Sequence, residues 1–287
     1  MIENRKVNAM STFVPPIKCQ GIKTKLVPFI QDSLKWDGAG TWIEPFLGSG
    51  VVLFNIQPQR AIVGDRNEHI IRFYQGIQTG LYTPEVVRNY LEKQSPLLIE
   101  GGVEYYYEVR RRFNEYHDPL DLLFLNRSCF NGIMRFNKSG GFNVPFCKKP
   151  ERFSKAYITK IVNQVAGAAE AMKGKDWEFR CDLWQDIIWS AREGDCVYLD
   201  PPYIGRDTNY VGEWSEEDAV SLADAAHASR ASIVALSMWK ENKYRKNDHL
   251  NECWADFEMR EYDHFYHVGA SESLRNKMVE ALMIRRR

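Results

Sequence analysis

The stretch TWIEPFLGSGVVLFNI, residues 41–56, decides how the chain is expected to fold. An apolar run at 41–45 is followed by a turn that contains Gly48 and Gly50, and residues 51–56 can then open a helix. A second apolar run at 61–64 ends in Asp65. Strand, glycine turn, helix and strand in this order are typical of the start of a parallel α/β sheet.

The same alternation returns in the second half of the chain. Helices and strands are expected to alternate over the segments 158–172, 177–180, 183–191, 195–200, 216–229 and 232–237. Ser215-Glu-Glu-Asp218 matches a capping box, which favours a helix start at this point. The segments 257–262 and 277–284 are expected to pair in antiparallel fashion at one edge of the sheet. We therefore predict one sheet of α/β type.

Composition excludes several classes of protein. Apolar residues make up 44% of the 287 and charged residues 26%, as in ordinary globular proteins with a sizeable core. Apolar runs stay far below the roughly 20 residues of a membrane span, and residues 1–13 lack the apolar segment of a secretion signal. The six cysteines show no CxxC spacing, so neither a disulfide scaffold nor a zinc ribbon is expected.

Residues 76–157 interrupt the α/β rhythm, and we interpret them as an inserted, mainly helical module with a hairpin. The chain has a net charge of +0, yet residues 127–155 contain seven basic residues and one acid. A basic stretch in an otherwise acidic chain is the electrostatic pattern of a nucleic-acid surface. Taken alone, such a run is more often a solvated charged face.

The glycine turn at 46–50 suits a nucleoside ligand. Glycines let the backbone approach a ligand closely, and an acid that ends the next strand, here Asp65, can bind ribose hydroxyls. No third glycine follows Gly50, so a ligand without a pyrophosphate fits better than NAD. Such turns occur in many unrelated proteins.

Asp200-Pro201-Pro202-Tyr203 directly follows a predicted buried strand, at the sheet edge where ligands bind. The two prolines stiffen the turn. A carboxylate and a carbonyl at one point can accept both hydrogens of an exocyclic amine, and Tyr203 offers a face on which a planar base can stack. Without further motifs, an ordinary Asp-Pro turn after a core strand would be the preferred interpretation.

Further motifs accompany it, and together they resemble the Dam-type (alpha-class, D12) DNA N6-adenine methyltransferases over residues 16–284. Residues 18–23, KCQGIK, keep both lysines and one glycine of the family's opening motif, but lack its tryptophan and second glycine. Residues 44–50, EPFLGSG, match its cofactor motif, and Asp65 matches its ribose-binding acid. Residues 125–146 match its target-recognition hairpin.

The resemblance implies a Rossmann-like methyltransferase sheet, formed by residues 1–75 and 158–287. It also implies an inserted, mainly helical target-recognition domain at 76–157 that carries a β-hairpin. S-adenosyl-L-methionine (AdoMet) is the implied cofactor, S-adenosyl-L-homocysteine is the product, and no metal is expected. The implied cofactor-binding residues are Lys23, Glu44, Pro45, Phe46, Gly48, Ser49, Gly50, Asp65, Asp182 and Leu183. The implied catalytic residues are Asp200, Pro201, Pro202 and Tyr203.

The implied reaction is methyl transfer to N6 of an adenine flipped out of double-stranded DNA. Arg135 is expected to read one guanine and Lys18 another, while Phe130 enters the duplex and Ile133 and Pro145 lie near a thymine methyl. Both guanine-reading residues are present, which favours the target GATC. The other expected DNA contacts are Arg127, Asn131, Asn137, Lys138, Lys148 and Lys149.

The expected setting is a monomer in the cytoplasm of a bacterium or of the bacterial host of a phage, without a membrane partner. A cognate restriction endonuclease acting on the same site is left open as a second partner. Three alternatives also stay open at this point. They are an N-methyltransferase for RNA or a protein amide, a catalytically silent DNA-binding protein and, more weakly, an NAD-dependent oxidoreductase.

Overall fold

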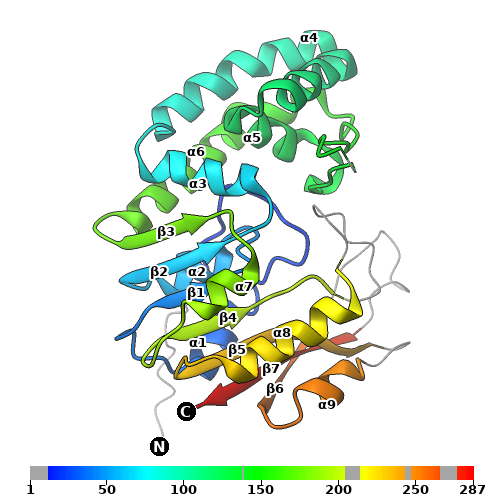
Figure 1. Ribbon diagram of the computed structural model, residues 1–287. Coiled ribbons are helices and arrows are strands. Elements are labelled where there is room, and N and C mark those ends of the chain that lie inside the picture. The colour runs from blue at the N-terminus through cyan, green and yellow to red at the C-terminus, as the bar shows by residue number, and fades with distance from the viewer. Residues whose placement is uncertain (1–11, 138, 204–213, 243–246, 266–276) are drawn as a thin grey trace, which may run out of the picture.

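A seven-stranded sheet organises the part of the chain that the structure describes. The computed structural model describes residues 12–137, 139–203, 214–242, 247–265 and 277–287 (Figure 1). The strand order is β3-β2-β1-β4-β5-β7-β6, with the first five strands parallel and β7 inserted antiparallel between β5 and β6. The strands are β1 Trp42–Glu44, β2 Arg60–Gly64, β3 Asp176–Arg180, β4 Cys196–Leu199, β5 Ile233–Asn242, β6 Glu258–Phe265 and β7 Lys277–Arg286. This is the predicted Rossmann-like sheet, including its antiparallel edge.

Helices cover both faces of the sheet. Neighbouring strand residues alternate between two cores, since Trp42 and Tyr198 belong to one core and Ile43 and Val197 to the other. The first core also contains residues of α1, α2 and α3, and the second contains residues of α7, α8 and α9. The helices are α1 Val27–Leu34, α2 Val51–Ile56, α3 Glu68–Gln78, α7 Trp184–Trp189, α8 Glu216–Ala228 and α9 His249–Cys253.

Local sequence signals account for several element ends. The predicted capping box at Ser215 and Asp218 is present at the start of α8. The other end of α8 is capped from β7, because the Arg285 guanidinium donates hydrogen bonds to the carbonyl oxygens of Ala226 and Ser229. No described helix is long and apolar enough to cross a membrane.

The segment between β2 and β3 forms a helical layer at the top of Figure 1. It contains α4 Pro84–Tyr116, α5 Pro119–Ser128, the 3-10 helices η1 Phe130–Gly132 and η2 Pro150–Phe153, and α6 Lys155–Met172. Gly102 has φ +51° and bends α4 into two halves. The apolar residues of this layer continue into the core on one face of the sheet. The boundaries of the expected target-recognition domain, at residues 76 and 157, stay a prediction.

The expected hairpin is a ribbon, residues 129–147, whose described part has two isolated bridges, Cys129–Phe146 and Phe136–Phe142, in place of regular strands. Inward side chains alternate with outward ones along both arms, as in strands. Met134, Phe136, Phe142, Val144 and Phe146 are buried, whereas Arg135, Asn137 and Pro145 are exposed. One face of the ribbon therefore packs on the helical layer and the other is open to solvent.

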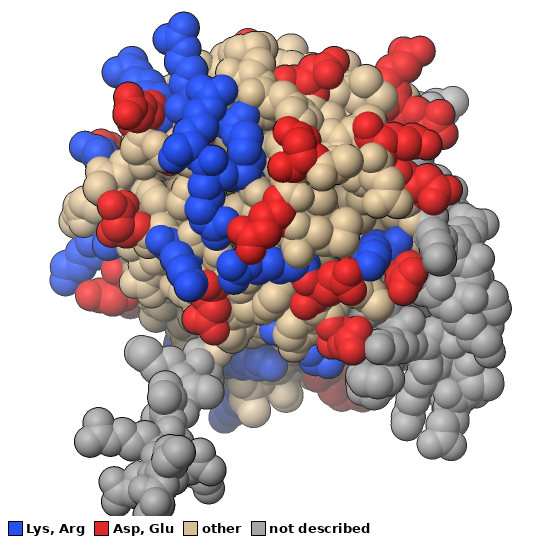
Figure 2. Space-filling view, turned by 90° about the horizontal axis from the view of Figure 1, so that it is seen from below, with Lys and Arg blue, Asp and Glu red and all other residues tan. Residues whose placement is uncertain are grey.

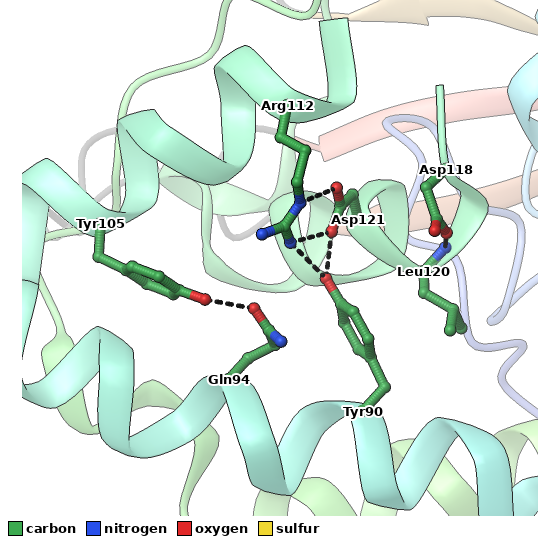
Figure 3. Close-up of polar contacts among 7 residues, drawn as sticks. All are labelled: Tyr90, Gln94, Tyr105, Arg112, Asp118, Leu120 and Asp121. Carbon is green, nitrogen blue, oxygen red and sulfur yellow. Dashed lines mark hydrogen bonds and ion pairs between the residues drawn. The ribbon is translucent and has the colours of Figure 1, made fainter. Parts of the chain in front are cut away.

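A polar cluster fixes the two halves of α4 to α5 (Figure 3). Asp121, which is 1% exposed, accepts hydrogen bonds from Arg112 Nε at 2.7 Å and Nη2 at 2.5 Å, and a further one from the Tyr90 hydroxyl. The Tyr105 hydroxyl bonds to Gln94 across the same bend. Charge-assisted, bidentate bonds of this kind are the strong ones.

We expect Asp121→Ala to lower the free energy of unfolding by about 2–3 kcal/mol, because it removes charged hydrogen bonds and leaves Tyr90 and Arg112 without their acceptor. Asp118→Ala is the control, since it removes only the N-cap bond to the Leu120 amide, which is typically worth about 1 kcal/mol. Urea unfolding measures both. Equal losses would show that the cluster contributes no more than a helix cap.

Candidate active site at the carboxyl edge of the sheet

Three acidic residues lie at the carboxyl ends of adjacent parallel strands. Glu44 ends β1, Asp65 follows β2 and Asp200 follows β4. Because β1 lies between β2 and β4, the sheet brings these residues to one edge. Ligands of open α/β sheets bind at this edge.

The two glycines of the turn have different roles. The Gly48 amide donates a hydrogen bond to Asp65 Oδ2 at 2.8 Å, and the Asn67 amide donates one to Asp65 Oδ1 at 2.8 Å. Gly48 has φ +52°, and a Cβ there would meet nothing within 4 Å, so the backbone is open to a ligand. Gly50 has φ +74°, and a Cβ there would lie 2.8 Å from the Phe54 ring. Gly50 is therefore needed for close packing against Phe54, whereas Gly48 leaves the backbone accessible to a ligand.

Asp65 is held as an acceptor at the edge of this open space. Burial raises the pKa of its carboxyl above the ordinary value, and the two backbone hydrogen bonds oppose the rise. The Asp65 amide in turn donates to the Arg180 carbonyl at the end of β3, which places residues 181–183 next to the turn. Asp182 and Leu183 are both exposed there. Gly48, Asp65, Asp182 and Leu183 therefore lie near one another at the carboxyl edge, and their role towards a ligand stays a prediction.

Pro45, Phe46 and Ser49, which were also expected at the cofactor, lie in and next to the glycine turn. Pro45 and Ser49 are buried, and the Ser49 carbonyl accepts a hydrogen bond from the Tyr74 hydroxyl at 2.6 Å. Phe46 is half-buried and packs against the rings of Trp184 and Trp214. Their role towards a ligand stays a prediction.

A buried lysine binds the predicted catalytic motif. Lys23, which is 3% exposed, places Nζ 3.0 Å from Asp200 Oδ1 and donates to the Tyr203 hydroxyl at 2.8 Å. Lys23 was expected at the cofactor, so its contact with both ends of the motif is a finding of the structure. Pro201 is buried and Pro202 half-buried between them.

The charges of this group depend on one another. Burial alone would lower the pKa of Lys23, but Asp200, Tyr203 and Glu280 together raise it well above its ordinary value. Burial raises the pKa of Asp200, and the Lys23 ammonium opposes that rise. Asp200 keeps 23% of its side chain exposed, so its carboxylate is accessible to an incoming group.

Glu280 is a site residue that the sequence interpretation missed. It lies on β7, is 1% exposed and accepts a hydrogen bond from the Tyr203 hydroxyl at 3.2 Å. A single acid within the apolar run MVEALMI, residues 278–284, was the available signal, because buried acids are rare unless they are paired.

Glu44 is buried behind the turn and accepts a hydrogen bond from Trp42 Nε1 at 2.7 Å. Burial raises the pKa of Glu44 to about 8, and the negative charge of Asp200 adds to the rise, whereas the bond from Trp42 opposes it. A pKa in this range favours the protonated form of Glu44 near neutral pH.

Lys18 joins the ribbon to the segment that carries Lys23. Its backbone amide and carbonyl both pair with the Asn126 side chain, at 2.9 and 2.8 Å. Its side chain covers Gly132, where a Cβ would lie 2.6 Å from Lys18 Cδ. The structure thus brings together two predicted DNA-contacting regions that are far apart in the sequence.

Several predicted DNA contacts point outward from the ribbon. The guanidinium of Arg135 is exposed and donates from Nε to Asn143 Oδ1 at 2.7 Å and from Nη2 to the Asn143 carbonyl at 3.1 Å, which fixes its direction. Phe130 is 51% exposed. Ile133 is half-buried. The other exposed residues are Asn131 and Pro145 in the ribbon, and Lys148 and Lys149 directly after it. Lys138 lies outside the described residues.

Arg127 and Asn137 are engaged within the protein. Arg127 is 2% exposed, donates to Gln164 and lies beside the ring of Tyr157. Asn137 Oδ1 caps the tip of the ribbon by accepting from the Ser139 and Gly141 amides. Arg127 is thus buried against α6, whereas Asn137 stays exposed at the tip of the ribbon, and the expected DNA contacts of both stay predictions. The burial of Arg127 depends on tertiary packing and cannot be read from the motif.

Within the described residues, no cluster of three or more His, Cys, Asp or Glu side chains is arranged to hold a metal ion. The face seen from below in Figure 2 carries its largest group of Lys and Arg at the upper left, while acidic side chains are spread over the whole face, including beside that group. It lies at the end of the molecule opposite the helical layer of Figure 1.

Comparison with known proteins shows which family the chain resembles. The model of the D12 class N6 adenine-specific DNA methyltransferases matches residues 20–268. The chain is 27% identical to the type II methyltransferase M1.LlaDCHI of Lactococcus lactis subsp. cremoris, over 99% of the chain and 98% of that protein. It is 32% identical to a DNA adenine methylase of Vibrio cholerae, over 73% and 74% of the two chains. For the DNA adenine methylase of Salmonella typhi the identity is 34%, over 68% and 67%.

We expect Glu44→Gln to change the pH dependence of stability. A carboxyl whose pKa rises on folding to about 8 keeps a proton that the unfolded chain has lost. The free energy of unfolding therefore falls with pH between the unfolded and folded pKa values, by up to about 1.4 kcal/mol per pH unit. Glutamine stays neutral and lacks this loss. Urea unfolding at pH 6, 7 and 8 should show the variant gaining on the wild type; parallel curves would show that Glu44 is ionised.

Proposed function

Because the chain belongs to the D12 class of N6 adenine-specific DNA methyltransferases, we propose that its carboxyl-edge site methylates N6 of an adenine flipped out of double-stranded DNA. The family implies AdoMet as the methyl donor. The observation that carries the proposal is the contact of Asp200 and Tyr203 with Lys23, at the same sheet edge as the open backbone of Gly48. We assign catalysis to residues 1–75 and 158–287, and target recognition to 76–157.

The cofactor would lie over the glycine turn. Asp65 would accept the ribose hydroxyls, the exposed Asp182 and Leu183 would contact the adenine, and the accessible Gly48 backbone would admit the molecule. When bound, AdoMet supplies an electrophilic methyl group on a sulfonium. With its pKa raised to about 8 by burial, Glu44 would be neutral near pH 7 and would add no charge next to the cofactor.

Asp200 would act on the target amine. The N6 lone pair of adenine is delocalised into the ring, which makes it a weak nucleophile. Hydrogen bonds from N6 to the Asp200 carboxylate and the Pro201 carbonyl would favour a pyramidal nitrogen and stabilise the positive charge that develops there. Lys23 holds the carboxylate in place from the protein side. Asp200 would then accept the proton that leaves N6 after transfer.

Sequence recognition would come from the ribbon, and we propose GATC as the target. Arg135 presents a fixed, exposed guanidinium, the geometry needed for a bidentate bond to guanine O6 and N7. Lys18 lies against the same ribbon and is suited to a second guanine. Phe130 is the exposed ring that would enter the duplex, with Ile133 and Pro145 near a thymine methyl.

Backbone binding would involve the basic residues beside the ribbon. A pocket of about 350 Å³ is lined by Lys149, Glu151, Arg152, Ser154 and Tyr157. Arg152 donates to the Tyr157 hydroxyl at 3.0 Å, and Arg127 lies on the same ring. Phosphates would contact Lys148, Lys149 and Arg152. The buried Arg127 would hold the Tyr157 ring, and with it Arg152, in position.

The setting of the reaction follows the relatives. Bacterial and phage proteins are among them, including a DNA N-6-adenine-methyltransferase of Escherichia phage P1. We propose that the enzyme acts as a monomer in the cytoplasm of a bacterium or phage host. One relative is named a type II methyltransferase, which supports a role beside a cognate endonuclease. The ribbon favours DNA over RNA or a protein amide as substrate.

We expect Asp200→Ala to reduce methyl transfer at least about a hundredfold while AdoMet affinity changes only a few-fold. Nucleoside mass spectrometry of unmethylated plasmid DNA measures N6-methyladenine, and calorimetry measures the affinity. Asp224→Ala, at an exposed position on α8, is the matched control and should behave as the wild type. Normal turnover of the Asp200 variant at saturating AdoMet would refute its catalytic role. Absence of methylated adenine with the wild-type enzyme would move the substrate to RNA or protein.

We expect Arg135→Ala to change the sequence specificity of DNA binding and Lys149→Gln to change only its strength. Arg135→Ala should reduce discrimination at one guanine by about 1–3 kcal/mol. Lys149→Gln should weaken all sequences equally and lower the slope of log K against log salt by about 0.9, because one phosphate contact is lost. Binding to GATC duplexes with single substitutions, at several salt concentrations, separates the two. Uniform weakening by Arg135→Ala would make Arg135 a phosphate contact.

A further inference from the structure

We propose that Glu280 is a positioning residue of the methyl-transfer site, which holds the Tyr203 hydroxyl and thereby sets how Lys23 is shared between Tyr203 and Asp200. The proposal rests on the proposed function and adds a residue from β7, in the antiparallel part of the sheet. No motif includes Glu280, and the cofactor and DNA contacts proposed above do not use it.

The position of Glu280 in the sheet fixes its side chain. It lies in the middle of β7, paired with Trp239 of β5 on one side and with Tyr262 of β6 on the other. Its neighbours Val279 and Ala281 are buried, as is Glu280 itself. Pairing on both sides fixes the backbone of Glu280, so its side chain leaves the sheet in a set direction, and it is shielded from solvent there.

The hydrogen bonds form a directed chain. Lys23 Nζ donates to the Tyr203 hydroxyl at 2.8 Å, and this hydroxyl donates to Glu280 Oε2 at 3.2 Å. A phenol that accepts one bond and donates another has its oxygen fixed at both sides. The ring that is to stack on the target base is thus held from β7, while Lys23 Nζ lies 5.1 Å from its centre.

The charges give Glu280 a second effect. One buried ammonium, Lys23, faces two carboxylates, Asp200 and Glu280. A buried carboxylate is costly unless it is paired, so its retention in an apolar strand needs a compensating gain. The excess negative charge keeps Lys23 from neutralising Asp200 completely, which leaves Asp200 a stronger acceptor where positive charge develops on N6.

The groups that face Asp200 come from several elements. They are Lys23 before α1, Glu44 at the end of β1, Tyr198 on β4, Tyr203 after β4 and Glu280 on β7. The charge of Glu280 raises the pKa of Asp200. Removal of that charge should therefore move the acidic limb of the kcat profile to lower pH.

The test compares Glu280→Gln with Glu261→Gln. Glutamine keeps the shape of the side chain but removes its charge. Glu261 is the control on neighbouring β6, where it is exposed and paired with Lys240 at 2.5 Å. We expect Glu280→Gln to lower kcat about tenfold, with KM for DNA and AdoMet changed less than about threefold. The acidic limb of its pH profile should shift downward, whereas Glu261→Gln should match the wild type.

Tyr203→Phe provides a second measurement that leaves the charge of Glu280 in place. If Glu280 acts through the hydroxyl, Glu280→Gln should cost less in the Tyr203→Phe background than in the wild type, which a double-mutant cycle measures. Fully additive losses, an unshifted pH profile, or a kcat equal to that of Glu261→Gln would each overturn the proposal. Failure of the proposed function would show differently, as a wild-type enzyme that does not methylate adenine.

Discussion

The buried ammonium of Lys23 is the interaction on which the site depends. An unpaired charge at 3% exposure would be prohibitively costly, so the chain must supply acceptors around it. Asp200 and Tyr203 do so from the end of β4, and the Gly21 carbonyl does so locally. The N-terminal segment can therefore dock only when β4 and its proline turn are formed. This dependence links an element that precedes the sheet to the strand at its centre.

Much of the fold could be predicted because its signals are local. The glycine turn, the capping box of α8 and the apolar run before Asp200 each depend on a few adjacent residues, and all three stand where they were expected. Strand length was less accessible, since β5 extends to Asn242 only because β7 pairs with it along that length. The ribbon was predicted by motif, but its isolated bridges were not.

The candidate site likewise contains residues whose place could be predicted from the sequence and residues whose place could not. Asp65 and Asp200 follow strands, so their place at the edge could be predicted from order alone. The contacts of Lys23 with Tyr203 and of Tyr203 with Glu280 span 180 and 77 residues, and a single sequence gives no measure of such pairs. Arg127 shows the converse, because a residue within a matched motif is buried by packing on α6 through Gln164. Motifs therefore locate the chemistry, while tertiary contacts decide which side chains are free to take part.

The segment 18–23 has a consequence for the geometry of methylation. One of its ends is pinned to Asn126 beneath the ribbon, and the other is pinned to Asp200 at the sheet edge. Five residue steps cover at most about 16–18 Å, and the turn at Gly21 shortens this span. If the ribbon reads the sequence and Asp200 binds the target amine, this short segment limits the number of bases between the base that is recognised and the adenine that is methylated. The distance along the DNA between the recognised base and the methylated adenine would then depend on the length of segment 18–23 as much as on the residues that contact the bases.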